Sequence, residues 1–148
     1  MPQPPNQQIF LIDEDDIVRD SLKVLLESHG VQVRDFRNAA EFLGNPGITR
    51  GGCVVLGHNR QISDGLAVMT ALRRRSVPLP AIFIVGGGDA ATRSAATAAG
   101  AFAYLERPIE EAALIRTVKA ALVRKSGRGP LEDILAPEPS VAAAAVRG

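Results

Sequence analysis

Short apolar runs alternate with amphipathic segments along most of the chain. Five of these runs predict strands, at residues 9–12, 31–36, 53–56, 81–85 and 102–105. After each strand, either apolar residues recur three or four positions apart or alanine predominates, which predicts a helix. Five strands that alternate with five helices predict a parallel sheet covered on both faces, in a doubly wound α/β fold.

Local signals place several helix ends. The first helix is expected to stop at His29, and Asn38 is a predicted N-cap for a short second helix. Asp89 is a predicted N-cap for an alanine-rich fourth helix that ends at Gly100. The basic run at residues 73–75 falls near the end of the third helix, where cations complement the helix dipole.

Functional groups in such a sheet collect at the edge where the parallel strands end. Four segments are expected there, at residues 13–16, 57–59, 85–87 and 106–108. The first strand delivers the acidic residues 13–16 to this edge, whereas the third strand runs into Gly57. Converging carboxylates would bind a divalent cation and supply a nucleophile, but glycine supplies neither. The missing carboxylate at Gly57 therefore dominates the functional interpretation.

Length and composition fit a single domain with a tail. With 148 residues, of which 46% are hydrophobic and 22% charged, the chain has the composition of a globular protein. The predicted organisation is a disordered N-terminus at residues 1–8, a domain at 9–124, and a linker and tail at 125–148, disordered or partly helical. A net charge of +1 gives no electrostatic case for nucleic acid or an anionic membrane as partner.

The sequence also indicates the cellular compartment. The single cysteine, Cys53, lies in an apolar strand, where a buried and inert thiol is expected. The N-terminal segment lacks the charge and apolar stretch of a signal peptide, and no apolar run approaches membrane-spanning length. These features predict a cytoplasmic protein.

Residues 9 to about 123 resemble the receiver domain of bacterial two-component response regulators, especially receivers of the nitrogen-fixation type of regulator. Four motifs carry the resemblance in order: Ile-Asp-Glu-Asp-Asp-x-Val-Arg-x-Ser-Leu at 12–22, Phe36 to Leu43, Gly100-Ala101 and Arg107-Pro108. The resemblance implies a flavodoxin-like sheet with strand order 2-1-3-4-5.

The same resemblance implies roles for five positions. Asp13 and Glu14 correspond to the acid pair that holds magnesium together with an acceptor aspartate, which takes a phosphoryl group from a histidine kinase. The acceptor position is occupied by Gly57, which cannot form an acyl phosphate. Val85 stands in place of the phosphate-contacting hydroxyl residue and has no hydroxyl to donate, and Arg107 replaces the lysine of a Lys-Pro motif.

These replacements predict a receiver in which the phosphorylation pocket is degenerate. Magnesium binding by Asp13 and Glu14 is expected to be weak or lost, and no cofactor is expected. We hypothesise that Arg107 pairs with these acids and fixes one conformation permanently. Tyr104 matches the family's switch aromatic on the face formed by the fourth helix, fifth strand and fifth helix, and an ordinary half-buried tyrosine is the alternative.

The other candidate sites have simpler interpretations. His58 has no partner histidine or cysteine nearby, which argues against a metal site. The glycine run at residues 86–88 lacks the lysine and hydroxyl residue of a phosphate-binding loop and is interpreted as a turn. No arrangement of serine, cysteine and histidine indicates a nucleophilic enzyme, so no enzymatic activity is expected.

Two functional hypotheses from different classes remain. The first is a stand-alone pseudo-receiver that signals by phosphorylation-independent binding to a histidine kinase, a histidine phosphotransfer protein or another response regulator. A homodimer through the face of the fourth helix, fifth strand and fifth helix belongs to the same hypothesis. The second is a small-ligand or metal sensor, in which an anion or cofactor occupies the space beside Arg107. A conventional phosphorylated regulator ranks third.

Overall fold

The computed structural model describes residues 8–45, 47–48, 52–58, 63–77, 79–86 and 90–123. Its strands form one parallel sheet in the order β2-β1-β3-β4-β5, which confirms the predicted fold class and strand order. The strands are β1 (Gln8–Ile12), β2 (Gln32–Phe36), β3 (Cys53–His58), β4 (Ala81–Val85) and β5 (Ala103–Glu106).

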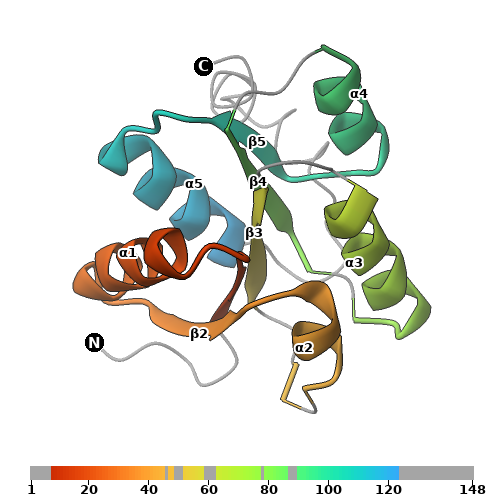
Figure 1. Cartoon of the computed structure of the whole chain (residues 1–148), viewed down its shortest axis with the longest axis horizontal. Coiled ribbons are helices and arrows are strands. Elements are labelled where there is room, and N and C mark those ends of the chain that lie inside the picture. Colours follow the sequence, from red (N-terminus) through yellow and green to blue (C-terminus); the bar gives the residue numbers. More distant parts are fainter. Residues whose placement is uncertain are drawn as a thin grey trace.

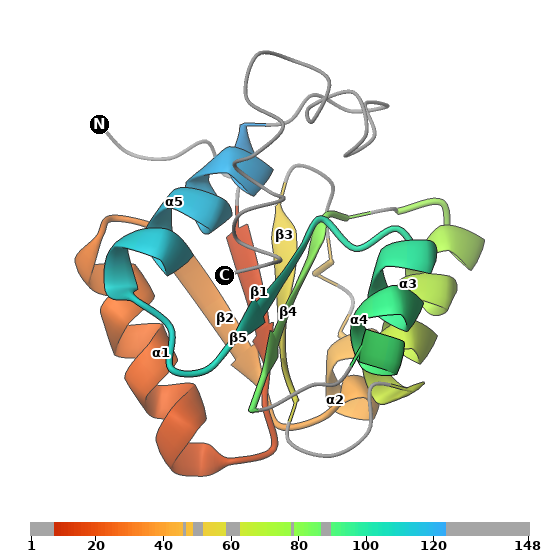
Figure 2. The same ribbon diagram turned by 90° about the horizontal axis from the view of Figure 1, so that it is seen from above.

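Helices cover both faces of the sheet. They are α1 (Asp16–Ser28), α2 (Ala39–Leu43), α3 (Ser63–Arg74), α4 (Ala90–Ala98) and α5 (Glu111–Leu122). Figures 1 and 2 show α1 and α5 on one face and α2, α3 and α4 on the other. None of the described helices is long and apolar enough to cross a membrane.

The strands β1, β3 and β4 contain continuous apolar runs, as expected where both faces of a sheet are buried. Along β1, Ile9 and Leu11 join the cluster under α1 and α5, whereas Phe10 and Ile12 join the cluster under α2, α3 and α4. Phe10 packs against the ring of Phe42 from α2, with 5.5 Å between the centroids. Burying each such side chain contributes about 1.5–3 kcal/mol, so this alternation anchors β1 in the middle of the sheet.

The predicted helix ends are found where the structure describes them. The Asn38 side chain accepts a hydrogen bond from the Glu41 backbone N–H at 2.8 Å and caps α2, and His29 is the C-cap of α1. Asp15 caps α1 by accepting from the backbone N–H groups of the first turn. The predicted cap Asp89 lies outside the described residues.

Two predicted boundaries need correction. Gln8 is the first residue of β1 and pairs with Gln32, so the predicted disordered N-terminus extends one residue too far. Gly57 lies inside β3 rather than after it, because β4 continues alongside and pairs Gly57 with Ile84. The remaining termini, 1–7 and 124–148, lie outside the described residues, and their organisation stays a prediction.

Candidate functional site

Asp13 is carried to the carboxyl edge of the sheet by β1 and is buried there. Its backbone N–H donates to the carbonyl of Phe36 at 3.1 Å, which continues the pairing of β1 with β2 by one residue. Its Oδ1 atom accepts from the Asp15 N–H at 2.8 Å. Only 2% of Asp13 is exposed, so the carboxylate is held against the sheet edge and out of solvent.

The Asp13 carboxylate lies over Gly57. A Cβ atom built on Gly57 would lie 2.6 Å from Asp13 Cγ and 3.0 Å from its Cβ, and closer still to Oδ2. Carbon atoms that are not bonded normally approach to about 3.5 Å, so any side chain at position 57 would require Asp13 to move. The carboxylate of Asp13 thus occupies the space that a side chain at position 57 would use.

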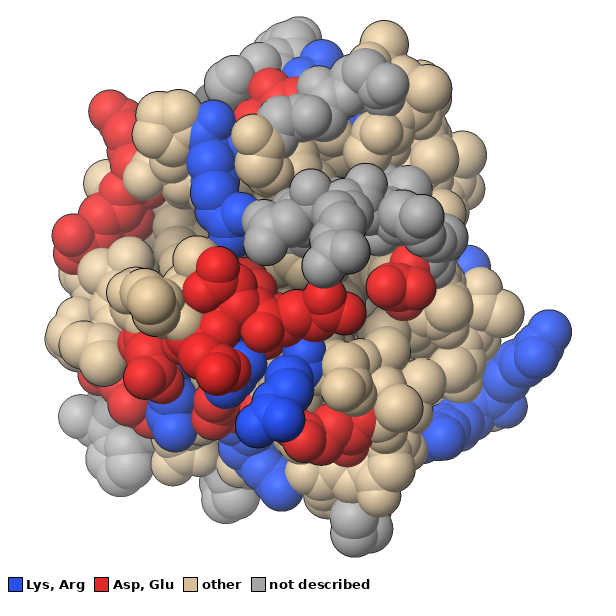
Figure 3. Space-filling view, in the orientation of Figure 1, with Lys and Arg blue, Asp and Glu red and all other residues tan. Residues whose placement is uncertain are grey.

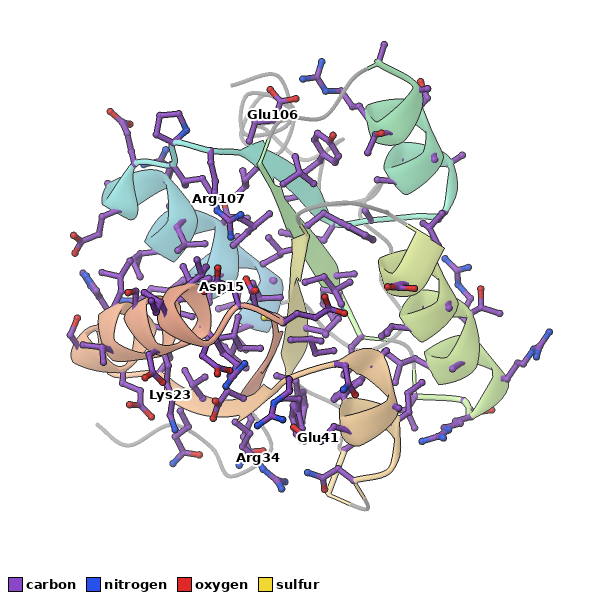
Figure 4. The ribbon with its side chains drawn as sticks, viewed as in Figure 1. Asp15, Lys23, Arg34, Glu41, Glu106 and Arg107 are labelled. Carbon is purple, nitrogen blue, oxygen red and sulfur yellow. The ribbon has the colours of Figure 1, made fainter. Side chains whose placement is uncertain are left out.

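Arg107 reaches the same carboxylate from the end of β5. Its backbone N–H donates to the carbonyl of Val85 at 2.9 Å, and the Arg107–Pro108 peptide bond is cis. The Arg107 Nη2 atom lies 3.5 Å from Asp13 Oδ2, and 27% of the Arg107 side chain is exposed. Figure 4 shows Arg107 extending over the edge of the sheet where Asp15 lies. The hypothesised pairing of Arg107 with Asp13 is therefore present, with a long contact.

Burial raises the pKa of the Asp13 carboxyl above its ordinary value. The hydrogen bond from the Asp15 N–H and the positive charge of Arg107 act in the opposite direction but do not cancel the effect of burial. The ionised carboxylate is therefore costly to the folded state. The Asp15 N–H and Arg107 offset only part of the free-energy cost of burying this charge.

The side chain of Val85 supplies no polar group to this edge. It is the last residue of β4, pairs with Glu106 of β5, and is 1% exposed. Its side chain belongs to the apolar cluster under α2, α3 and α4. The position that the receiver resemblance assigns to a hydroxyl residue is thus part of the core.

The residues at this edge do not fit a magnesium site. Magnesium requires near-octahedral coordination by oxygen, and Gly57 contributes no side-chain oxygen. Both Asp13 oxygens already face a donor, Oδ1 the Asp15 N–H and Oδ2 Arg107. Within the described part of the chain, no group of three histidine, cysteine, aspartate or glutamate side chains is arranged to hold a metal ion.

A cavity of about 700 Å³ opens beside Gly57, on the side of α2 and α3. The acidic residues Asp13, Glu14, Asp15 and Asp64 are among its lining residues, and its apolar lining includes Leu56. No lysine or arginine is among its described lining residues. In Figure 3 acidic side chains gather in the middle of this face of the molecule. The cavity is therefore acidic, and Arg107 is not part of its lining.

Arg19 is a residue of this region that the sequence did not single out. From α1, it donates to the Asp13 carbonyl oxygen at 2.8 Å, to Asp35 Oδ2 at 3.0 Å and to Asp16 Oδ1 at 2.7 Å. It thereby joins the turn after β1 to β2. Arg19 could have been found from its spacing to Asp16, because residues three apart lie on one face of a helix and can form an ion pair.

Tyr104 is fully buried, which corrects the half-buried exposure that the alternative interpretation gave it. It is 1% exposed and packs in the cluster under α2, α3 and α4. The Cζ atom of Arg93, from α4, lies 5.6 Å from the centre of its ring. Arg93 also donates to Glu106 Oε2 at 3.0 Å. A switching role for Tyr104 stays a prediction.

The remaining candidates have structural roles where they are described. Burial raises the pKa of the Cys53 thiol to about 12, as expected of an inert thiol. The last turn of α3 contains Arg73, whose guanidinium donates to the Ala99 carbonyl after α4. Arg75 donates to the Leu43 carbonyl of α2 at 2.7 Å. The side chain of His58 and residues 87–88 of the glycine run lie outside the described part.

Sequence comparison gives relatives along most of the chain. The model of the response regulator receiver domain matches residues 9–119. The transcriptional regulatory protein FixJ of Azorhizobium caulinodans is 35% identical over 130 residues, which are 88% of this chain and 62% of that relative. TdiR of Thauera aromatica, also a transcriptional regulatory protein, is 40% identical over 114 residues, which are 77% of this chain and 50% of that relative. The chain thus spans less than two thirds of the length of either relative.

Solved structures agree with the sequence comparison. The crystal structure of FixJ-N is similar with a TM-score of 0.73 at 26% identity, and the match covers 82% of this chain and 98% of that one. Full-length FixJ from B. japonicum gives a TM-score of 0.70 at 33% identity, covering 78% and 57% of the two chains. The chain therefore belongs to the family of response regulator receiver domains.

Proposed function

We propose that this receiver signals without phosphorylation of an acceptor aspartate. One observation carries the proposal: the Asp13 carboxylate, buried beside Arg107, occupies the space of a side chain at Gly57. Glycine has no carboxylate to form an acyl phosphate, so the residue that the resemblance assigns to phosphoryl transfer is chemically unable to perform it. Val85 and Arg107 depart from the expected phosphate contacts in the same pocket.

In this proposal the domain acts by binding other proteins and has no enzymatic activity. Its partners are histidine kinases, histidine phosphotransfer proteins or other response regulators of a two-component pathway in the cytoplasm. A homodimer through α4, β5 and α5 is the corresponding arrangement with a second copy. Because Arg107 already lies beside Asp13, the pocket has a cation and a carboxylate in contact without a phosphoryl group.

A ligand-sensing function is the second candidate, and the cavity beside Gly57 favours it. A volume of about 700 Å³ lies within the usual range of small-molecule sites. Its four carboxylates disfavour the anion that the sequence suggested, since no lysine or arginine is among the described lining residues. We rank it second because it rests on the cavity alone.

The test of the proposal is the intact mass of the full-length chain after incubation with acetyl phosphate and magnesium. The wild type and the variants Gly57→Asp and Gly57→Asn are treated in parallel. We expect no phosphoryl adduct on the wild type or on Gly57→Asn, whose amide matches aspartate in size but cannot accept the group. An adduct confined to Gly57→Asp would support the proposal and show that the rest of the pocket stays competent.

The contrary result is a phosphoryl adduct on the wild type that survives in Gly57→Asn. It would mean that another side chain accepts the group, and peptide mapping would locate it among the acids at 13–16 or at His58. Thermal stabilisation of the wild type by a small molecule, without any protein partner, would instead move the ligand-sensing function to first place.

A further inference from the structure

We infer that Arg93 holds α4 against β5 by contacting Glu106 and Tyr104. We call these three residues the latch. The Arg93 Nη2 atom donates to Glu106 Oε2 at 3.0 Å, which is a contact between α4 and the last residue of β5. Its Cζ atom also lies 5.6 Å from the centre of the Tyr104 ring, two residues earlier in the same strand. One guanidinium thus contacts two side chains of β5.

Arg93 is the more exposed partner of its contact with Tyr104. The Arg93 side chain is 36% exposed, whereas Tyr104 is 1% exposed, so the contact joins a partly exposed side chain to a buried ring. A cation is attracted to the negative face of an aromatic ring, and the Glu106 carboxylate holds the cation in that position through a charge-assisted hydrogen bond. Figure 4 shows Glu106 at the end of β5.

The composition of α4 makes this contact important for its attachment. The helix is built mainly from alanine, serine and threonine, and Ala96 is its only fully buried residue. By contrast, α5 buries six residues: Leu114, Ile115, Thr117, Val118, Ala121 and Leu122. Because α4 buries little apolar area, polar contacts carry a larger share of its attachment to the sheet. Arg93 provides one of these contacts, and Arg73 of α3, bonded to the Ala99 carbonyl, provides another.

The consequence concerns the surface that partners meet. While the latch is closed, α4 and β5 present one arrangement with Tyr104 inside. In a receiver that is not phosphorylated, this latch rather than a phosphoryl group would control the arrangement, and this consequence rests on the proposed function. The latch itself depends only on Arg93, Glu106 and Tyr104.

The chain offers a specific probe of the latch. It has one tyrosine and no tryptophan, so its tyrosine fluorescence reports Tyr104 alone. Acrylamide quenching of that fluorescence is measured on the full-length wild type and on Arg93→Met, Arg93→Lys and Glu106→Gln. Arg116→Met, which removes an exposed arginine of α5, is the matched control. Circular dichroism establishes that each variant is folded.

We expect Arg93→Met and Glu106→Gln to raise the quenching constant of Tyr104 by about twofold or more, because local opening exposes the ring. Combining the two changes should add little, since either one opens the same latch. Arg93→Lys should recover part of the protection because it keeps the cation, and Arg116→Met should match the wild type.

Unchanged quenching in both folded single variants would overturn the latch. If Arg93→Met fails to fold, the quenching of Glu106→Gln alone tests the latch. This variant keeps the shape of the residue 106 side chain and removes its charge. A phosphoryl adduct on the wild type would defeat the proposed function while leaving the quenching result valid. Unchanged quenching without an adduct would defeat only the latch.

Discussion

Two carboxylates at the ends of neighbouring strands, Asp13 after β1 and Asp35 in β2, have opposite electrostatic settings. Asp35 faces two cations, with Arg19 Nε at 3.0 Å and Lys23 Nζ at 3.2 Å. Asp13 faces one, Arg107, at 3.5 Å. The Asp35 side chain is 26% exposed, whereas Asp13 is only 2% exposed. The more deeply buried acid therefore has the weaker compensation.

The pKa values of the two groups shift in opposite directions. Burial raises the pKa of Asp13, and its partners do not cancel that effect. Burial also acts to raise the pKa of Asp35, but hydrogen bonds from Lys23 and Arg19 together outweigh it and lower the value. Ionised Asp35 therefore stabilises the fold at neutral pH, and this contribution is lost as the pH falls. Ionised Asp13 destabilises the fold, and this cost is relieved as the pH falls through its raised pKa.

Removing Arg19 should have the largest effect on this comparison. Arg19→Met retains the apolar part of the side chain but removes donors to Asp35 and to the Asp13 carbonyl. We expect the free energy of unfolding at pH 7 to fall by about 2–3 kcal/mol, because charged hydrogen bonds in a largely buried position are lost. Urea unfolding followed by circular dichroism measures it.

Lys23→Met is the matched control, since it removes the other and more exposed cation beside Asp35. Lys23→Met should lower the free energy of unfolding by less than about 1 kcal/mol, as is usual for partly exposed ion pairs. Equal losses in the two variants would contradict a special role for Arg19 in joining the turn after β1 to β2.

Removing Arg107 should have a smaller effect. In Arg107→Ala the buried Asp13 carboxylate loses its nearby cation, which is only 3.5 Å away in the wild type. We expect a loss of about 1–2 kcal/mol at pH 7, larger than for an exposed ion pair. The loss should shrink in acid, where Asp13 is protonated, and should nearly vanish when measured in an Asp13→Asn background. A loss that does not depend on residue 13 would show that Arg107 stabilises the domain through other contacts.

Asp13→Asn should change stability in the opposite direction and by the smallest amount. The amide oxygen can still accept from the Asp15 N–H, while the buried charge is removed. We expect a gain in the free energy of unfolding at pH 7, because the ionised carboxylate, whose pKa burial raises, costs the folded state free energy that a neutral amide does not. The gain should diminish as the pH falls through the raised pKa of Asp13 toward the ordinary value of about 4. Thermal unfolding at several pH values measures it, and a destabilised variant at pH 7 would contradict this account of Asp13.

The fold could be predicted because its signals are local and periodic. Apolar runs, helical spacing and a cap such as Asn38 depend on residues that are close in the sequence. The receiver resemblance added the strand order, which the sheet confirms. The end of β3 was placed too early, because Gly57 pairs with β4 although glycine is a poor strand residue in isolation.

The sequence predicted which residues form the site but not how their side chains are placed relative to one another. Position along the chain brings Asp13, Gly57 and Arg107 to one sheet edge, and all three are found there. No sequence signal indicated that Asp13 would fold over Gly57, because that depends on side-chain rotamers and on the space that glycine leaves. Arg93 was likewise missed, since its partner Glu106 is 13 residues away on another element.

The central claim is that Asp13 occupies the space of the missing side chain at position 57. A double-mutant cycle tests it most directly, with the free energy of unfolding measured for wild type, Gly57→Ala, Asp13→Ala and the double variant. We predict that Gly57→Ala costs about 1–3 kcal/mol when Asp13 is present, as crowding in a packed site does, and much less when residue 13 is alanine. An equal cost of Gly57→Ala in both backgrounds would contradict the claim.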